Sequence, residues 1–451
     1  MAEYAEEGRA LQCQSMSPEQ EAPRALAWQT PLRGLLEVPG SKSIAQRALL
    51  LGALAPGQTQ LLGDFSSADV QHMLCTFEEL DWKPKNEHGG LLTLMGGLHP
   101  SPGRRVYVGE SGTGGRLWSA LIGLGGLGPD ARGVGAHGSL CRRRSGALLK
   151  ALEGAGAGVT VTHPERGDFP LTLVPVPAGE LGSLELANPN SSQEVTGLLL
   201  GLAARPDRCP LRVQGVIPSE PYVQLTLGVL ERFGVRARWE REAEASSFVL
   251  EGELRAPKRP FTIEPDASGA AVALAAGCLS GGDVSVRGLD SESLQGDVAI
   301  VRHLQAFGCD AGFDKVGVWA RGMPNRGAEL DLTGEPDLAP VLAAVAAGAA
   351  FVGGGPSRLT GLGTLPGKES DRLAVLQAGL TELGFQVHAG PDELRIARGM
   401  PHAEARVLDP HGDHRMAFAF ALLSLFLKGV QVSEPECVLK SWPTFWRDLT
   451  Q

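Results

Sequence analysis

A polar cluster followed at once by an apolar run rich in Ala and Leu occurs six times along the chain, at intervals of about 70 to 80 residues. Each copy opens with Ser, Asp or a Pro-Asp pair, which are residue types that favour helix N-termini. The six copies are SKSIAQRALLLGALAPG from Ser41, SGTGGRLWSALIGLGG from Ser111, SSQEVTGLLLGLAARP from Ser191, DASGAAVALAAGCLSGG from Asp266, PDLAPVLAAVAAGAA from Pro336 and DHRMAFAFALLSLFLKG from Asp413. The pattern predicts six buried helices whose polar first turns are free to face a common place.

A second series of segments runs in step with the first and predicts a more exposed partner helix in each unit. Leucines recur there at three- and four-residue spacing, and most copies end in a Gly followed by a short β-prone stretch. The copies begin at Val70, Ala147, Leu225, Val298 and Arg372. Repetition alone leaves a solenoid or a plain α/β stack open, but solenoid repeats usually span 20 to 50 residues. The longer period favours a small βα subdomain per copy, with three copies in each of two domains.

Length and composition agree with a globular protein of that size. The 451 residues fit two or three domains, no uninterrupted apolar segment of membrane-spanning length occurs, and the acidic N-terminus lacks a signal-peptide core. We therefore expect a soluble, cytoplasmic protein in which residues 1–25 form a disordered tail. The seven cysteines are scattered without a CxxC pair, which indicates neither a disulfide framework nor a zinc site.

The distribution of charge indicates small anionic ligands. A net charge of −10 argues against nucleic acid or an anionic membrane as the main partner. Basic residues nevertheless gather near the starts of the predicted repeat helices, where free N–H groups and the helix dipole also attract anions. These are Lys42, Arg47, Arg116, Arg142, Arg143, Arg144, Lys368, Arg372, Arg415 and Lys440. Phosphate or carboxylate ligands are the leading expectation.

Eight motifs in register resemble the 5-enolpyruvylshikimate-3-phosphate synthase (3-phosphoshikimate 1-carboxyvinyltransferase) family of enolpyruvyl transferases. They are LEVPGSKSIAQRALLLGALA at Leu36, GESGTGGR at Gly109, SSQ at Ser191, SEPYVQLTL at Ser219, EPD at Glu335, GKESDRL at Gly367, GDHRMAFAF at Gly412 and KSWPTFW at Lys440. The resemblance implies a two-domain, inside-out α/β fold of six βαβαββ repeats with buried helices, three repeats per domain. It places one domain at residues 42–259 and the other at residues 26–41 plus 260–451, because the chain crosses between domains twice.

The resemblance also implies a reaction, in which the enolpyruvyl group of phosphoenolpyruvate moves to the 5-hydroxyl of shikimate 3-phosphate and phosphate leaves. This step belongs to the shikimate pathway of chorismate and aromatic amino acid biosynthesis. It needs neither a metal nor an organic cofactor, so protein cations must neutralise the substrates and side chains must move protons. Small-molecule substrates are the only partners expected, with no nucleic acid or membrane, and the chain is expected to be monomeric.

The matched motif positions supply a set of candidate site residues. For phosphoenolpyruvate the resemblance implies Lys42, Gly112, Arg143, Gln193, Arg372, Arg415 and Lys440. For shikimate 3-phosphate it implies Lys42, Ser43, Arg47, Ser191, Ser192, Gln193, Ser219, Tyr222, Asp337 and Lys368. Proton transfer is assigned to Asp337, as base toward the 5-hydroxyl, and to Glu369 with Lys42 at C3 of the enol. The residues alone favour Asp337 as a first-turn acid and Glu369 as half of a surface pair with Lys368, and the family resemblance reverses that preference.

Two other motifs are discounted as sites for a metal or a nucleotide. The spacing of His411, Asp413 and His414 does not place all three side chains on one helical face, and no fourth metal ligand accompanies them. GESGTGGR has Gly115 where a P-loop requires Lys, so a tight turn into a helix is expected but nucleotide binding is not. Only Arg143 of the arginine triplet falls on the family position.

Several positions depart from the family pattern. Glu110 and Ser111 replace an Asn-Ala pair, Leu117 and Arg144 replace prolines, and Thr364 stands for an Asn near the shikimate ring. These changes lie in substrate-positioning loops and leave the charged centre intact. Two alternatives therefore stay open. The first is an enzyme that transfers enolpyruvyl to UDP-N-acetylglucosamine, which has Lys-Asn where this chain has Lys42-Ser43, and the second is a non-catalytic anion-binding relative.

Overall fold

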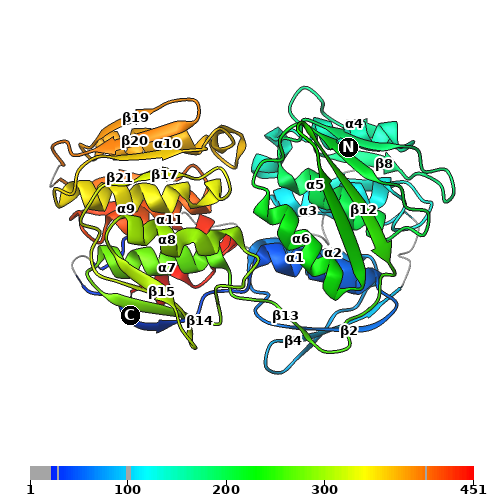
Figure 1. Cartoon of the computed structure of the whole chain (residues 1–451), viewed down its shortest axis with the longest axis horizontal. Helices are drawn as coiled ribbons and strands as arrows, with labels where there is room; N and C mark the ends of the chain where they lie inside the picture. Colours follow the sequence, from blue (N-terminus) through cyan, green and yellow to red (C-terminus); the bar gives the residue numbers. More distant parts are fainter. Residues whose placement is uncertain (1–21, 28–29, 98–102, 402–403, 451) are drawn as a thin grey trace.

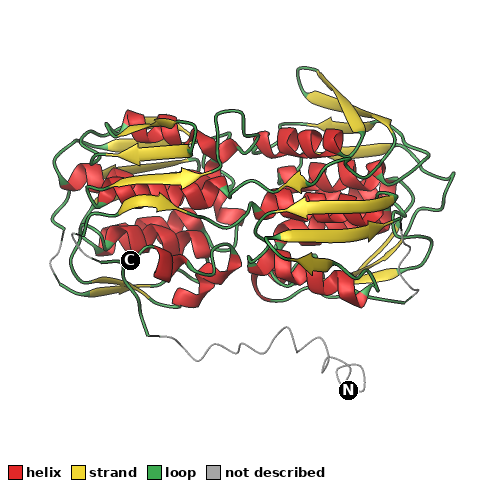
Figure 2. Cartoon of the chain, turned by 90° about the horizontal axis from the view of Figure 1, so that it is seen from below, coloured by secondary structure: helices red, strands yellow, loops and turns green. Residues whose placement is uncertain are grey.

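The computed structural model describes residues 22–27, 30–97, 103–401 and 404–450. Its buried side chains fall into two separate hydrophobic cores. One core takes residues from Ile44 to Ile263, and the other takes Leu26, Leu32 and Val38 together with residues from Ala267 to Leu449. Figure 1 shows the two halves side by side, and Figure 2 shows helices and strands layered in each of them.

Each of the six predicted buried helices is present. Five begin at a Ser or Asp N-cap whose side chain accepts a hydrogen bond from a first-turn backbone N–H, while the sixth continues from the 3₁₀ turn η5 (Pro336–Leu338). The helices are α1 (Lys42–Leu54), α3 (Gly112–Gly123), α5 (Ser192–Ala203), α7 (Ala267–Leu279), α9 (Ala339–Phe351) and α11 (His414–Leu423). In Figure 1, α7, α9 and α11 lie side by side inside one half.

The partner helices are also confirmed, each following its buried helix after one strand. They are α2 (Ala68–Glu79), α4 (Gly146–Gly154), α6 (Pro221–Arg232), α8 (Ile300–Ala306) and α10 (Arg372–Glu382). Short helical segments complete the described chain: η3 (Gly138–Arg142), η4 (Gly296–Ala299), η6 (Leu365–Gly367), η7 (Pro435–Lys440) and α12 (Phe445–Asp448).

The strands form small sheets with one repeated topology. In every four-stranded sheet the first two strands in space are parallel and the others antiparallel, as a βαβαββ unit requires. In the half that contains α1, α3 and α5, the strand orders are β13 (Phe261–Thr262), β2 (Gly57–Leu62), β4 (Leu91–Gly96), β3 (Lys85–Glu87); β5 (Val106–Tyr107), β6 (Arg132–Gly135), β8 (Leu171–Val174), β7 (Gly158–Val161); and β9 (Leu184–Ala187), β10 (Leu211–Gln214), β12 (Ala245–Gly252), β11 (Val235–Arg241). In the half that contains α7, α9 and α11, they are β1 (Arg33–Leu36), β14 (Asp283–Arg287), β16 (Gly317–Arg321), β15 (Asp310–Phe313); and β17 (Glu329–Asp331), β18 (Ser357–Thr360), β20 (Glu393–Ala397), β19 (Gln386–Ala389). This half also has the strand pair β21 (Arg406–Leu408) and β22 (Val430–Val432).

The two crossings between halves exchange strands. β1 precedes α1 in the chain but pairs with β14 of the other half, and β13 precedes α7 but pairs with β2. The crossing segments lie against each other, since Ser41 N donates to Glu264 O at 2.8 Å and Asp266 N to Pro39 O at 2.8 Å. The N-termini of α1 and α7 are therefore held beside the junction, each belonging to a different half.

The described part of the chain includes residues that were predicted to lie in the N-terminal tail. Residues 1–21 lie outside the described residues, but Arg24 N donates to Val432 O at 3.0 Å and Val432 N donates to Arg24 O at 2.8 Å. The prediction of a disordered tail is therefore wrong for Arg24, because its backbone pairs with Val432 of β22. Among the described residues no helix is long and apolar enough to cross a bilayer.

Candidate active site

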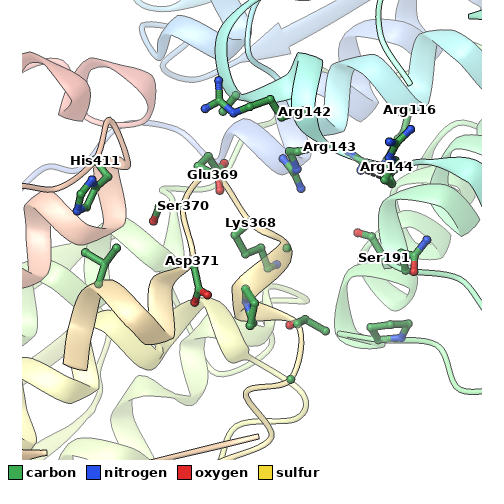
Figure 3. Close-up of a pocket in the computed structure, with 18 of the residues that line it drawn as sticks. Arg116, Arg142, Arg143, Arg144, Ser191, Lys368, Glu369, Ser370, Asp371 and His411 are labelled. Carbon is green, nitrogen blue, oxygen red and sulfur yellow. Dashed lines mark hydrogen bonds between the residues drawn. The ribbon is translucent and has the colours of Figure 1, made fainter. Parts of the chain in front are cut away.

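A cavity of about 850 Å³ separates the two halves at the N-terminal ends of their helices. From one half it is lined by the loop carrying Arg142, Arg143 and Arg144 and by Ser191, and from the other by residues 363–371 and His411. Figure 3 shows Lys368 and Glu369 facing Arg143 across this space. Positive side chains therefore approach the cavity from both sides.

A smaller, more enclosed cavity of about 60 Å³ adjoins the first and shares Arg143, Ser191, Lys368 and Glu369 with it. Its lining contains every residue predicted for the site except Lys440. The predicted residues that line it are Lys42, Ser43, Arg47, Gly112, Arg143, Ser191, Ser192, Gln193, Ser219, Tyr222, Asp337, Lys368, Glu369, Arg372 and Arg415. Asp69, Thr113 and His414 complete the lining.

Asp337 is the most strongly paired carboxylate in this cavity. Its Oδ1 lies 3.1 Å from Lys368 Nζ and 2.9 Å from Arg372 Nη1, and its Oδ2 lies 3.3 Å from Arg415 Nη2. Burial alone would raise the pKa of Asp337, but the three cations outweigh it and hold the pKa well below its usual range. Asp337 is thus ionised, and it is more than the exposed cap that its place in the first turn would allow.

Glu369 forms a second buried anionic centre, and its partner Lys440 contacts the other half of the protein. It lies 2.7 Å from Arg372 Nη2 and 3.2 Å from Lys440 Nζ, and Lys440 Nζ also donates to the Glu110 carbonyl of the other half at 3.3 Å. Burial would raise the pKa of Glu369, yet Lys440 and Arg372 hold it well below its usual range. The predicted alternative of a surface pair between Glu369 and Lys368 is wrong, because Lys368 pairs with Asp337.

The guanidinium of Arg372 is also held by Asp413, a residue that the sequence led us to consider only as a metal ligand and to reject in that role. Its Nε lies 2.8 Å from Asp413 Oδ2, and its side chain is 1 % exposed. The surrounding carboxylates raise the pKa of Arg372 despite its burial. Arg372 is therefore a permanently charged hub that contacts Asp337, Glu369 and Asp413 together.

Lys42 and Arg143 are the cations that the other half contributes. Lys42 Nζ lies 3.1 Å from Asp69 Oδ2, a carboxylate on α2 that sequence reasoning missed because no motif surrounds it. No hydrogen bond or ion pair of the Arg143 guanidinium is found among the described residues, and its Nε is buried. A Cβ at position 112 would collide with this guanidinium, so Gly112 is what lets Arg143 lie against the start of α3. Arg143 is therefore available to bind an anion.

Arg47 lines the cavity, but the protein itself satisfies its guanidinium. Its nitrogens donate to Thr226 Oγ1 at 2.9 Å, to Ser43 O at 2.6 Å and to Thr196 Oγ1 at 3.2 Å. Burial lowers the pKa of Arg47 to about 10. The geometry suits a residue that orders Ser43 beside the cavity better than one that grips a ligand directly.

Arg116 is a further buried cation that was noted only as part of the basic set. It donates to Gly112 O at 2.9 Å, to Gln193 Oε1 at 3.2 Å and to Arg144 O at 3.0 Å. Burial and the neighbouring Arg143 lower the pKa of Arg116 to about 9. It ties together α3, α5 and the arginine loop, and it fixes which side of the Gln193 amide faces the cavity.

Four of the positions that depart from the family pattern lie in or beside the cleft or core as follows. Ser139 donates from its N (3.3 Å) and its Oγ (3.2 Å) to the Glu110 carboxylate, so this acid holds the arginine loop. Leu117 is fully buried in the core, and Arg144 lies 3.2 Å from Asp168 Oδ1. Thr364 lines the large cavity, and its Oγ1 is buried without a hydrogen-bond partner among the described residues. None of the four side chains disrupts the charged centre.

His414 is buried against the inner cavity, and neither ring nitrogen has a hydrogen-bond partner in the described part of the chain. Burial, with Lys42 and Arg415 nearby, lowers the pKa of His414 well below its usual value, so the ring is neutral. His411 is on the rim of the outer cavity instead. In residues 22–27, 30–97, 103–401 and 404–450, no group of three or more His, Cys, Asp or Glu side chains is placed to hold a metal ion.

Solved structures with the same architecture are enolpyruvyl transferases. The chain superposes on EPSP synthase from Acinetobacter baumannii with a TM-score of 0.74 at 24% identity, over 94% of this chain and 96% of that one. It superposes on the enolpyruvyl transferase NikO from Streptomyces tendae with a TM-score of 0.71 at 16% identity, over 95% and 97% of the two chains. The chain thus has the two-domain α/β fold of these structures, with a cation-rich cleft between its halves.

Sequence comparison identifies the family within that class. The family model for EPSP synthase (3-phosphoshikimate 1-carboxyvinyltransferase) matches residues 26–449. The 3-phosphoshikimate 1-carboxyvinyltransferase of Cellvibrio japonicus (strain Ueda107) is 34% identical over 429 residues, which is 93% of this chain and 96% of that protein. The enzyme of the same name from Shewanella oneidensis is 30% identical over 92% of this chain and 96% of its own length. The chain belongs to the EPSP synthase family.

Proposed function

We propose that the cleft transfers the enolpyruvyl group of phosphoenolpyruvate to the 5-hydroxyl of shikimate 3-phosphate and releases phosphate, the activity that the family assigns to this chain. The observation that carries the assignment at the site is a cavity that two buried, ionised carboxylates, Asp337 and Glu369, share with cations of both halves. Lys368, Arg372, Arg415 and Lys440 of the same half pair with the carboxylates, and Lys42 and Arg143 line the cavity from the other half. Both substrates are phosphorylated anions. The cations of the site can bind them only when substrate oxyanions replace Asp337 and Glu369 as their partners.

The two substrates would take different parts of the cleft. Phosphoenolpyruvate would be held by the arginines and lysines that can pair with phosphate and carboxylate, namely Lys42, Arg143, Arg372, Arg415 and Lys440, with Gly112 and Gln193 adjoining. Shikimate 3-phosphate would be held by the hydroxyls and amide of Ser43, Ser191, Ser192, Gln193, Ser219 and Tyr222 together with Lys42, Lys368 and Asp337, while Arg47 orders that wall.

The chemistry would proceed by addition and elimination at C2. A proton from the Lys42 ammonium goes to C3 of the enol, and the 5-hydroxyl oxygen attacks C2 while its own proton passes to Asp337. The tetrahedral adduct then gives a C3 proton to neutral Lys42 or to the ionised Glu369 carboxylate, and the phosphate leaves with the C2–O electron pair and takes up the proton from Asp337, which restores the double bond. Each step is a proton transfer or a heavy-atom bond change between groups that cations can stabilise.

Ligand binding would activate Asp337 as a base. With three cations within 3.3 Å, its pKa is too low for effective proton abstraction. Substrate oxyanions that draw Arg372, Arg415 and Lys368 toward themselves would remove this stabilisation, and the pKa of Asp337 would rise in the bound state. The 60 Å³ inner cavity is smaller than typical ligand pockets, so these side chains must part for substrate to enter from the larger cavity.

We further propose that the two cores correspond to domains at residues 42–259 and 26–41 plus 260–451, and that the protein works as a cytoplasmic monomer. Phe261 and Ile263 pack in the first core, so that domain is best extended a few residues past 259. Because the site residues come from both halves, relative movement of the domains would open and close it.

A phosphate-release assay with two acceptors and a control without acceptor tests the assignment. Phosphoenolpyruvate with shikimate 3-phosphate is expected to release phosphate stoichiometrically, whereas phosphoenolpyruvate alone or with UDP-N-acetylglucosamine is expected to release none. Release with the nucleotide sugar would indicate the related transferase instead, which the family match does not favour. Binding of shikimate 3-phosphate without turnover would indicate a non-catalytic relative.

A further inference from the structure

A buried carboxylate outside the predicted site is linked to it through a single hydroxyl. Asp297 lies in η4, behind the first turn of α7, and is 2 % exposed. Its Oδ2 accepts a hydrogen bond from Ser268 Oγ, and the same Ser268 oxygen accepts one from Arg415 Nη2 at 3.1 Å. Arg415 Nη2 lies 3.3 Å from Asp337 Oδ2. A chain of contacts therefore runs from Asp297 through Ser268 and Arg415 to Asp337.

We propose that Asp297 is a positioning residue for enolpyruvyl transfer, which acts through Ser268 to set how firmly Arg415 holds Asp337. The inference rests on the proposed function, because Asp337 has a base to be tuned only if that reaction occurs. It adds to the reaction a residue that touches neither substrate and lines neither cavity.

The geometry explains how this influence would work. A hydroxyl that donates to a carboxylate becomes a better acceptor, so ionised Asp297 strengthens the bond from Arg415 to Ser268. Arg415 then shares its charge between Asp297 and Asp337, and its hold on Asp337 weakens. When Asp297 is protonated, the charge of Arg415 acts on Asp337 alone. The pKa of Asp337 then stays lower, and Asp337 is a weaker base.

The charges around Asp297 place this change near neutral pH. Burial raises the pKa of Asp297 to about 7, against the lowering effect of Arg415 on α11 and the hydrogen bond from Ser268, while Asp337 and Asp266 raise it further. The Tyr222 phenol on α6 also faces this carboxyl, and burial with Asp297 and Asp337 raises the pKa of Tyr222 well above its usual value. Tyr222 is therefore neutral, and Asp297 is the group of this set that titrates between pH 6 and 8.

The remaining oxygen of Asp297 supports a role beyond packing. Oδ1 is buried and has no hydrogen-bond partner among the described residues. An unpaired buried carboxylate oxygen costs stability, which a residue serving only structure would be expected to avoid. Replacement by Asn, which keeps the size of the side chain, is therefore not expected to unfold the protein.

Kinetics of three variants as a function of pH test the proposal. Asp297→Asn is expected to lower kcat about tenfold at pH 8, a typical scale for outer-shell partners, and to remove the acid-limb ionisation near pH 7 that we expect in the wild-type profile. Ser268→Ala is expected to do the same, and the double variant should be no worse than either single one. Asp290→Asn, on an exposed loop preceding η4, is the matched control and should leave the profile unchanged.

Several results would overturn the proposal. An acid limb that persists in Asp297→Asn, or additive losses in the double variant, would show that Asp297 does not act through Ser268. A ¹³C carboxyl titration of aspartate-labelled protein gives a reading independent of turnover, since one resonance titrating near pH 7 should vanish in Asp297→Asn. If the wild type itself fails to turn over, the proposed function fails. If that resonance is absent from the wild type, this inference fails.

Discussion

Lys42→Met is expected to lower kcat at least about 10³-fold, one of the largest effects that we expect of a single substitution. The change removes the charge that neutralises phosphoenolpyruvate and a proton carrier beside C3 at once. It also leaves the buried Asp69 carboxylate, now 3.1 Å from Lys42 Nζ, without its cation. Steady-state phosphate release, beside a thermal melt of the same sample, measures the loss and shows whether the fold survives.

Lys42→Arg separates the two roles of the lysine. A guanidinium restores the charge but cannot give up its proton near neutral pH, so we expect substrate binding to recover and kcat to stay below about a hundredth of the wild-type value. Lys150→Met, on the exposed face of α4, is the matched control and should be fully active. Substantial turnover by Lys42→Arg would mean that Lys42 serves only as a charge.

Asp337→Asn and Glu369→Gln should each slow turnover by about 10² to 10⁴-fold, but with different binding effects. Asp337 would contact shikimate 3-phosphate, so its replacement should also raise the KM of that substrate. Glu369 would serve the enol carbon, so its replacement should act mainly on kcat. Glu382→Gln, at the exposed end of α10, is the control for a surface carboxylate of the same half.

Thermal melts of the carboxylate variants distinguish a structural role from a catalytic one. The depressed pKa of Asp337 stabilises the fold above pH 4, near the carboxyl pKa of the unfolded chain, and this contribution is lost as pH falls through the folded-state pKa. Asp337→Asn should therefore melt below the wild type at pH 7, and the difference should shrink in acid. Near-normal turnover combined with such a melting difference would make Asp337 and Glu369 structural residues.

The repeat pattern predicted the helices because it contains the two features that govern their formation, a capping residue and a run of apolar residues that can be buried. A Ser or Asp before each apolar run caps the helix, and the run itself is hydrophobic enough to be enclosed, as at Ser41 and Asp266. The exchange of β1 and β13 between halves could not be predicted from these patterns. Strand pairing across 250 positions for β1 and 200 for β13 depends on long-range geometry, and a short strand carries no sign of its partner.

For the candidate site, too, the sequence predicted one part and not another. Motif positions collected the residues that line the cavity, but they did not reveal which cation pairs with which carboxylate. Asp69 and Asp297 were missed as supporting groups because their local sequence has no distinctive pattern, whereas Asp413 stands in the GDHRMAFAF motif but its contact with Arg372 is not visible in the sequence. A residue that acts by holding another is identified by distance alone. The pairing of Lys368 with Asp337 rather than Glu369 is an example, since neighbours in sequence are not neighbours in the site.

The most direct test of the central claim follows the labelled carbon of [2-¹³C]phosphoenolpyruvate by NMR with enzyme and shikimate 3-phosphate. We predict that its resonance is replaced by that of an enol ether carbon bonded to the 5-oxygen, as phosphate appears in equal amount. Lys42→Met and Asp337→Asn should leave the label in phosphoenolpyruvate. An unchanged label with wild-type enzyme, or an enol ether formed only with UDP-N-acetylglucosamine, would contradict the account.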